Sequence, residues 1–278
     1  MRAMSTSLVA LLVAGLPAAV PASAAQAAET CQERLVTISD SDGGTVEGTD
    51  GDDVILTTGD DTTIIAAKGG DDTICLGEGV VFAGPGKDSV YVGGEVELEY
   101  LDIRDAEDLD ITIGDGGAFL QLVNIRRGAG TVDVSGGAAL TLIGRNSVEA
   151  DLKRDTMALD GGAYTLLGNP AIFSIARRVE LVGDTSANNL RANQYSCEIT
   201  IKGGRGDDSL EVAGSDGDLP FPESCGPRSP KLSGQGGDDV LQGRRFDDRL
   251  LGGRGTDVAR GGFGRDTCRA ETRKNCER

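Results

Sequence analysis

The sequence predicts an all-β protein, a parallel β-helix or β-roll solenoid whose coils are joined by glycine-rich turns. Three observations lead to this fold class. The chain has 42 glycines and only 4% aromatic residues, too little bulk for an ordinary globular core, yet its 38% hydrophobic residues are too many for a disordered chain. Glycine-opened blocks of nine residues repeat without interruption over residues 234–269, and short alternating hydrophobic runs fill the middle of the chain. A thin aliphatic stack enclosed by glycine turns accounts for all three.

The N-terminal residues 1–27 are typical of a secretory signal peptide. Arg2 gives a short basic start, an apolar run follows from Leu8 to Leu16, and small residues end the segment. The apolar run is too short to span a bilayer, and no later segment is apolar enough to stop transfer. We therefore expect a secreted, extracellular protein without a transmembrane segment.

Residues 28–92 are expected to form an N-terminal capping segment followed by irregular repeats. Acidic glycine turns that end at Asp53, Asp72 and Asp88 each precede a short hydrophobic strand. The steps between these aspartates are 19 and 16 residues, so neither equals two blocks of nine. The spacing predicts coils of the same solenoid in which the phase of the acidic turns slips.

In residues 93–183 the strands continue and the acidic turns disappear. Apolar and polar residues alternate, as in 109–113, with the period of a strand that buries one face. A Gly-Gly-Ala sequence before a hydrophobic run recurs at 116–118, 136–138 and 161–163, a spacing that suits coils of a parallel β-helix with variable loops. A β-sandwich of hairpins is the competing interpretation. We favour the solenoid because repeats flank the region on both sides.

Residues 184–269 carry the regular blocks of nine. Each of the four blocks from residue 234 opens with glycine, has aspartate in the sixth place and has a residue that can be buried in the eighth. Glycine allows the positive φ values of a tight turn and brings carbonyl groups together, and the residues after the aspartate form a short strand whose middle side chain points inward. Good turn chemistry in a surface loop is the alternative explanation, but it does not enforce a nine-residue phase.

The turn glycines are Gly234, Gly237, Gly243, Gly252, Gly255, Gly261 and Gly264. The sixth-position residues are Asp239, Asp248, Asp257 and Asp266. The eighth-position residues are Leu241, Leu250, Ala259 and Cys268.

These blocks resemble the calcium-binding nonapeptide G-G-x-G-x-D-x-U-x of the repeats-in-toxin (RTX, hemolysin-type) family. The resemblance implies that Ca²⁺, a hard cation that takes six to eight oxygen ligands, binds to the turns as the protein's cofactor. One nonapeptide would be half a coil, so Asp239 and Asp257 would lie on one edge of the solenoid, and Asp248 and Asp266 on the other. These four aspartates are the predicted metal ligands.

Other parts of the pattern are less regular. In the second block, residues 244–246 replace the expected Gly-x-Gly, so we expect a distorted turn and the weakest of the four sites. A complete earlier block ends its turn at Asp208, but 31 residues separate this aspartate from Asp239, so it is expected to lie out of phase. The interruption at 214–230 contains four prolines and is predicted to be an inserted surface loop pinned by Cys225. The irregular candidate ligands are Asp53, Asp72, Asp88 and Asp208.

Six cysteines suit an oxidising compartment, although six allow fifteen connectivities and free buried thiols are the alternative. Proximity along the chain suggests Cys268 with Cys276 and Cys197 with Cys225, which leaves Cys31 with Cys75. The first of these bridges would close a C-terminal cap at 270–278. Such a cap is expected because an exposed last coil offers unpaired backbone to other chains.

The composition limits the chemistry. The formal net charge of −18 argues against nucleic acid and anionic membranes as partners. The absence of histidine excludes Ser-His-Asp and Cys-His catalysis and His-Glu-x-x-His zinc sites. A calcium-dependent polysaccharide lyase or hydrolase needs only carboxylates and a basic residue. The acids near Arg104 that could serve one are Asp102, Asp105, Asp108 and Asp110, although solvated loop charge also explains them.

The expected function is therefore that of a secreted, non-enzymatic calcium-binding repeat protein whose fold is stabilised by calcium between coils. The polysaccharide lyase or hydrolase is one alternative. A cell-envelope adhesion module that binds extracellular or cell-wall polysaccharide is another, because residues 243–278 carry ten basic against six acidic residues. Ordinary solvated turn positions would explain the same basic excess.

Overall fold

The computed structural model describes residues 29–58, 63–93, 101–104, 106–114, 118–123, 125, 128–214, 225 and 228–277. The predicted signal peptide at 1–27 and most of the inserted loop at 214–230 lie outside the described residues. Within the described ranges the structure consists of strands and turns without a helix, and so no helix there could cross a membrane.

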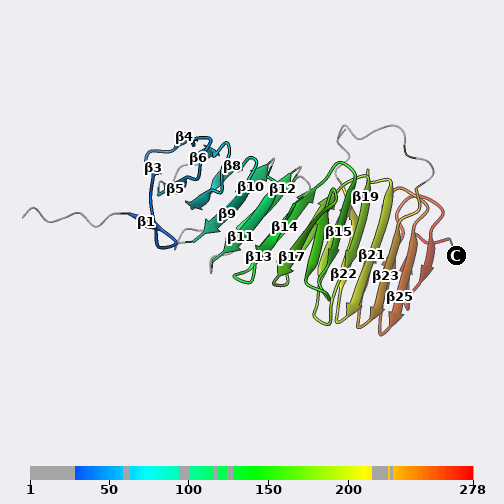
Figure 1. Cartoon of the computed structure of the whole chain (residues 1–278). Helices are drawn as coiled ribbons and strands as arrows, with labels where there is room; N and C mark the ends of the chain where they lie inside the picture. The colour runs from blue at the N-terminus through cyan, green and yellow to red at the C-terminus, as the bar shows by residue number, and fades with distance from the viewer. Residues whose placement is uncertain are drawn as a thin grey trace, which may run out of the picture.

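The protein is a solenoid of two parallel sheets that the chain visits in alternation (Figure 1). The predicted all-β parallel solenoid is confirmed. The 12-stranded sheet contains β4 (Gly44–Glu47), β6 (Thr63–Ala66), β8 (Gly79–Phe82), β10 (Leu101–Arg104), β12 (Ala118–Val123), β14 (Ala138–Ile143), β18 (Ala171–Ile175), β20 (Asn189–Asn193), β22 (Ser209–Ala213), β24 (Val240–Gln242), β26 (Val258–Arg260) and β28 (Thr272–Lys274). The 14-stranded sheet contains β3 (Ile38–Asp40), β5 (Val54–Thr57), β7 (Thr73–Leu76), β9 (Lys87–Val92), β11 (Asp108–Ile113), β13 (Ala129–Asp133), β15 (Ser147–Asp151), β16 (Thr156–Leu159), β17 (Gly162–Leu167), β19 (Arg178–Val182), β21 (Glu198–Arg205), β23 (Lys231–Gly236), β25 (Arg249–Arg254) and β27 (Thr267–Arg269).

The core is a single aliphatic stack between the two sheets. Equivalent side chains of successive coils lie in register, as in the ladder that pairs Leu232 with Leu250 and Leu250 with Cys268. The predicted inward positions are buried, since the eighth residues of the four blocks are at most 2% exposed. Because side chains alternate across a strand, the residues on either side of each core residue face outward.

Two coils in the middle depart from the all-parallel pattern. β16 pairs antiparallel with both β15 and β17 and so inserts a reversal into the 14-stranded sheet. Asp155 and Asp160, which have positive φ values of 55° and 48°, stand at its two turns. The Asp160 carboxylate accepts backbone N–H groups from Arg145, Asn146 and Ser147, which fixes the second turn.

Three disulfides brace the two ends and the inserted loop. They join Cys31 to Cys75, Cys197 to Cys225 and Cys268 to Cys276, with Cα–Cα distances of 5.8, 5.3 and 5.9 Å. These are the pairs that proximity along the chain suggests. The first ties β1 (Thr30–Cys31), which forms a hairpin with β2 (Arg34–Leu35), to β7.

Candidate metal centre

The glycine turns line the two long edges of the solenoid. We call edge A the side where the chain passes from the 14-stranded to the 12-stranded sheet, with turns 203–208, 234–239 and 252–257, and edge B the opposite side, with turns 243–248 and 261–266. One block is half a coil, and aspartates 18 residues apart lie on the same edge, as expected.

The sixth-position aspartates form a hydrogen-bonded ladder along each edge. The backbone N–H of Asp239 donates to Oδ1 of Asp257 at 3.0 Å, and the N–H of Asp248 donates to Oδ1 of Asp266 at 2.9 Å. All four carboxylates are buried, at most 2% exposed. Each aspartate that accepts a backbone N–H from the preceding coil does so through Oδ1, and its Oδ2 is buried without a protein partner. The unpartnered atoms of the regular ladders are Oδ2 of Asp208, Asp239, Asp257 and Asp266.

The first glycine of each block makes room for this second oxygen. A Cβ built on Gly234 would lie 1.9 Å from Oδ2 of Asp239 and 2.7 Å from the carbonyl oxygen of Gly252 in the next coil. A Cβ on Gly261 would lie 2.2 Å both from Oδ2 of Asp266 and from the carbonyl oxygen of Asn275. A carboxylate oxygen and a carbonyl oxygen of the next coil therefore face the same small space.

The positive φ values lie within the first four positions of the block, as predicted, at the second and fourth positions; in the third block these are Gly253 at 123° and Gly255 at 131°. The first glycines, Gly234, Gly243, Gly252 and Gly261, do not have positive φ values, and their role in the turn is to allow the close approach of oxygen atoms. The fourth glycines do have positive φ values, of 127° at Gly237, 131° at Gly255 and 128° at Gly264. A Cβ on Gly255 would also lie 1.9 Å from the Gly237 carbonyl oxygen, so two constraints exclude a side chain there.

The second block has a different turn, as its sequence predicted. Arg244 and Phe246 occupy its second and fourth positions without positive φ. The Arg244 N–H donates to Oδ2 of Asp248 at 2.9 Å, so this oxygen is already hydrogen-bonded. The other oxygen, Oδ1, is the unpartnered one here. In the preceding coil the residue beside Asp248 is Pro230, which has no N–H to donate.

The prediction that Asp208 lies out of phase is wrong. Its backbone N–H donates to Oδ1 of Asp239 at 2.9 Å across a separation of 31 residues. The insertion at 214–230 lies between β22 and β23, and therefore on edge B. Extra residues on one edge leave the register on the other intact, so edge A carries an unbroken column. It consists of Asn188, Asp208, Asp239, Asp257 and Glu271.

The predicted phase slip in the N-terminal coils is also wrong. The N–H of Asp53 donates to Oδ1 of Asp72 at 2.9 Å, and the N–H of Asp72 donates to Oδ1 of Asp88 at 3.1 Å. The unequal steps arise on the opposite edge, where five residues (58–62) connect β5 to β6 and two (77–78) connect β7 to β8.

Sequence reasoning missed the residues that end both ladders. Glu271 Oε2 accepts the N–H of Asp257 at 2.8 Å, and Glu277 Oε2 accepts the N–H of Asp266 at 2.6 Å. The separations of 14 and 11 residues do not fit a nine-residue period, so the repeat pattern carries no signal for them. Both glutamates belong to the cap that the Cys268–Cys276 bridge closes.

Burial shifts the titration of the ladder carboxylates. It raises the pKa of Asp208 to about 6 and that of Asp248 to about 7, although the accepted N–H groups oppose the shift and neighbouring carboxylates add to it. Burial likewise raises the pKa of Asp239, Asp257 and Asp266 above the ordinary value. An ionised carboxylate with an unpartnered buried oxygen is costly unless a cation lies beside it.

The ladder oxygens fit a hard cation. No three His, Cys, Asp or Glu side chains gather as a metal cluster among the described residues. The carboxylate oxygens would thus be joined by backbone carbonyl oxygens such as those of Gly252 and Asn275, and such an all-oxygen set is what Ca²⁺ prefers.

The comparison with protein families agrees with this chemistry. Residues 233–268 match the family model of the RTX calcium-binding nonapeptide repeat, in four copies. The predicted resemblance is confirmed for this segment. A search of curated proteins found no significant match to the chain.

The described acidic residues near Arg104 accept hydrogen bonds within and between coils. Asp102 is fully buried, and its Oδ2 accepts hydrogen bonds from Arg104 Nη2 at 2.6 Å and Gln121 Nε2 at 3.2 Å. Asp108 and Asp110 accept backbone N–H groups of the next coil at 2.7 and 2.8 Å. All three are strand residues and not loop residues, and Asp102 is buried, so the interpretation as solvated loop charge is wrong for Asp102; the side chains of Asp108 and Asp110 are exposed and partly exposed. The fourth, Asp105, lies outside the described residues.

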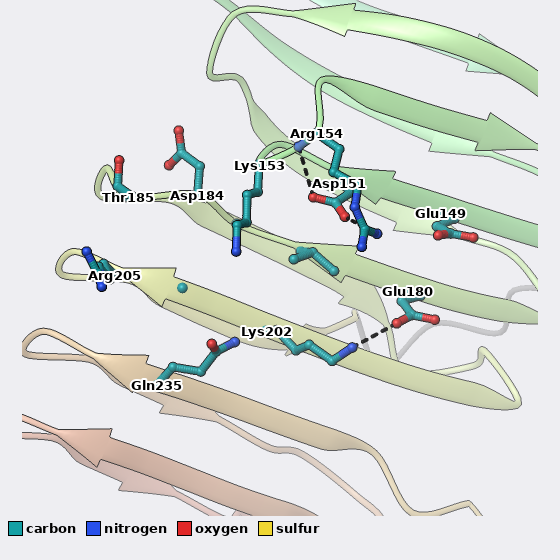
Figure 2. Close-up of a pocket in the computed structure, with 13 residues that line it drawn as sticks. Glu149, Asp151, Lys153, Arg154, Glu180, Asp184, Thr185, Lys202, Arg205 and Gln235 are labelled. Atoms are coloured by element: carbon teal, nitrogen blue, oxygen red, sulfur yellow. Dashed lines mark hydrogen bonds and ion pairs between the residues drawn. The ribbon is translucent and has the colours of Figure 1, made fainter.

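A charged groove of about 550 Å³ lies on the outer face of the 14-stranded sheet beside edge A (Figure 2). Arg154 pairs with Asp151 at 3.0 Å, and Lys202 pairs with Glu180 at 3.0 Å. Lys153 and Arg205 also line the groove, both are exposed, and neither forms an ion pair with another described residue. The lining carries four basic and four acidic side chains, and so its formal net charge is zero; Glu149 and Asp184 are the carboxylates of the groove that form no ion pair with another described residue.

Proposed function

We propose that the protein is an exported, non-enzymatic calcium-binding solenoid whose C-terminal coils are stabilised by Ca²⁺ held between successive turns. The observation that carries the proposal is the row of unpartnered buried oxygens on Asp208, Asp239, Asp257 and Asp266. The family match over residues 233–268 supports calcium as the ion. The signal-like leader and the three disulfides support export into an oxidising compartment.

The physical role of the ion follows from the ladders. Without a cation, each buried carboxylate must either bind a proton or stay ionised beside other carboxylates that repel it. At neutral pH both alternatives lower the free energy of unfolding. A cation that binds the folded chain alone adds its binding free energy to the free energy of folding. Outside the cell, sites with dissociation constants of roughly 10⁻⁴–10⁻³ M suffice.

Thermal unfolding of the mature protein with excess Ca²⁺ and with excess chelator tests the proposal. At a free Ca²⁺ concentration 100 times its dissociation constant, each site contributes about 2.7 kcal/mol, so chelation should lower Tm clearly. Mg²⁺ is the control, because it prefers a smaller octahedral site and keeps its water. Identical melting curves in calcium and chelator would contradict the proposal.

A second candidate function is adhesion to an acidic extracellular polysaccharide, for which Lys153 and Arg205 are the exposed groove cations that form no ion pair with another described residue. If Lys153 and Arg205 bind the polymer, Lys153→Ala/Arg205→Ala should weaken binding to polygalacturonate or alginate. Arg178→Ala, which removes an exposed cation already paired with Glu198 at 3.8 Å, should not. The same incubation tests for an enzyme, because a lyase would release unsaturated ends and a binding module would not.

A further inference from the structure

Two turns near the N-terminus have the backbone of the C-terminal nonapeptides. They are residues 67–72 and 83–88, which lie outside the segment that matches the RTX model. Their second positions, Lys68 and Gly84, have φ values of 77° and 93°, and their fourth positions, Gly70 and Gly86, have 116° and 144°. In the matched segment, Gln235 and Gly237 have 78° and 127° at the same two positions.

The sixth position of both turns is a buried aspartate with one free oxygen. Asp72 and Asp88 are 1% and 0% exposed. Oδ1 of each accepts a backbone N–H of the preceding coil, whereas Oδ2 of each is buried without a partner. Burial raises the pKa of Asp72 to about 6 and that of Asp88 to about 7, in the same direction as in the C-terminal ladders.

The column has two definite ends. At one end, Oδ2 of Asp53 accepts the N–H of Thr49 at 2.6 Å and its hydroxyl at 3.0 Å, so this carboxylate is already satisfied. At the other end, the residue that pairs with Asp88 in the next coil is Leu109, which is 1% exposed. Within this column, only turns 67–72 and 83–88 therefore combine the positive-φ backbone of the nonapeptide turns with an unpartnered carboxylate oxygen.

Backbone carbonyls supply the remaining oxygen ligands at this place. A Cβ on Gly86 would lie 2.0 Å from the Gly70 carbonyl oxygen, just as a Cβ on Gly255 would lie 1.9 Å from that of Gly237. The carbonyl of one turn thus points at the next turn in both regions. We propose that turns 67–72 and 83–88 form a second binding site for a hard divalent cation, with Asp72 and Asp88 as its carboxylate ligands.

This second site differs from the C-terminal ones in one respect. Its turns begin with Ala67 and Ala83, both fully buried, where the regular blocks begin with glycine. At Gly252 a Cβ would lie 2.1 Å from the free oxygen of Asp257, so a methyl group at this position takes up space that the carboxylate uses elsewhere. The N-terminal site is accordingly smaller, and we expect it to bind Ca²⁺ more weakly than the C-terminal array.

The inference shares its cation with the proposed function but depends on other residues, so one titration separates the two. The experiment measures bound calcium by equilibrium dialysis of the mature full chain, for the unsubstituted protein, for Asp72→Asn/Asp88→Asn and for Asp239→Asn/Asp257→Asn. The N-terminal variant should lose at least one bound ion and keep the C-terminal ones. A full complement of bound calcium in that variant overturns the second site, and a full complement in the other variant overturns the proposed function.

Asparagine is a tolerated residue in such a ladder. Asn188 occupies this position on edge A, where its Oδ1 accepts the Asp184 N–H at 2.9 Å and its own N–H donates to Asp208. Asp71→Asn is the matched control, because Asp71 is the exposed neighbour in the same turn and accepts the Lys87 N–H through Oδ1. It should bind as much calcium as the unsubstituted protein. An equal loss in this control would overturn the assignment to the buried carboxylates.

Hydrogen exchange gives a second measurement that needs no variant. Amide protection over residues 67–91 should increase with calcium in the unsubstituted protein. This increase should need a higher calcium concentration than the one over residues 234–269. Exchange at 67–91 that does not respond to calcium overturns the second site even where the double variant fails to fold.

Discussion

The C-terminal and N-terminal coils build the same acidic ladder from different spacings. Along the C-terminal array the steps are 18 residues, whereas the N-terminal steps are 19 and 16. In both regions a backbone N–H donates to the carboxylate of the next coil, so hydrogen bonding between coils fixes the register and chain length does not. The segments 58–62 and 214–230 each lie on the edge opposite a ladder whose register they leave intact, the Asp53–Asp72–Asp88 ladder in the first case and the Asp208–Asp239 step in the second. A strict period in the sequence therefore identifies only part of the stacked turns.

The largest effect should come from the fourth glycine of a regular turn. Gly255→Ala places a Cβ 1.9 Å from a backbone carbonyl at a φ of 131°, and overpacking of this kind costs about 1–3 kcal/mol. Denaturant unfolding should show a loss at the upper end of this range, with or without calcium. Gly236→Ala is the control, because a Cβ there would meet nothing closer than 4.0 Å. Equal losses in both variants would show that the turn geometry is not the cause.

The ladder carboxylates should show a change of sign with calcium. Asp257→Asn keeps the acceptor for the Asp239 N–H but removes a buried charge. In chelator the variant should unfold at the same temperature as the unsubstituted protein or higher. In calcium at 100 times its dissociation constant it should lose up to about 2.7 kcal/mol of stabilisation. The control is Asp238→Asn, because Asp238 is the exposed residue next to Asp239 in the preceding coil, and this variant should change neither value. A variant destabilised equally in both conditions would point to a purely structural aspartate.

The pH dependence separates the metal-free from the calcium-loaded protein. Burial raises the pKa of four ladder carboxylates from the ordinary 3.8 to about 6 or 7: Asp72, Asp88, Asp208 and Asp248. At pH values between 3.8 and these raised pKa values, the folded metal-free chain therefore binds more protons than the unfolded chain. Its stability should therefore rise as the pH falls from about 7 toward 4 and decline as the pH rises through the folded pKa values. Calcium should be most effective above pH 7, because protons compete for the same oxygens. Melting curves at several pH values check both trends, and a metal-free protein most stable above pH 7 would contradict them.

The smallest effect should come from shortening the inserted loop. Deletion of residues 215–222 retains Cys225, and a change in loop length of this size alters the closure free energy by about 0.6 kcal/mol or less. Because the loop joins β22 to β23 on edge B, the Asp208–Asp239 hydrogen bond on edge A should persist. Calcium titration of the deletion variant should match that of the full chain. A marked loss of affinity would show that the loop helps to set the register.

Much of the fold could be predicted from the sequence because glycine turns, aspartates and inward aliphatic residues share one period in residues 234–269. The antiparallel β16 could not be predicted, since parallel and antiparallel strands have the same two-residue alternation. The ladder roles of Glu271 and Glu277 depend on the cap that brings them back to the edges, which no local spacing indicates. The phase of Asp208, Asp72 and Asp88 depends on which edge absorbs the irregular residues, and that is a property of the coil.

The central claim is that calcium lies between the stacked acidic turns, and a crystal structure at millimolar calcium tests it most directly. The account predicts anomalous scattering peaks beside Oδ2 of Asp239, Asp257 and Asp266, with calcium–oxygen distances of about 2.3–2.6 Å to these atoms and to backbone carbonyls. Ladders that remain without metal at that concentration, with the same oxygens buried and unpartnered, would contradict it.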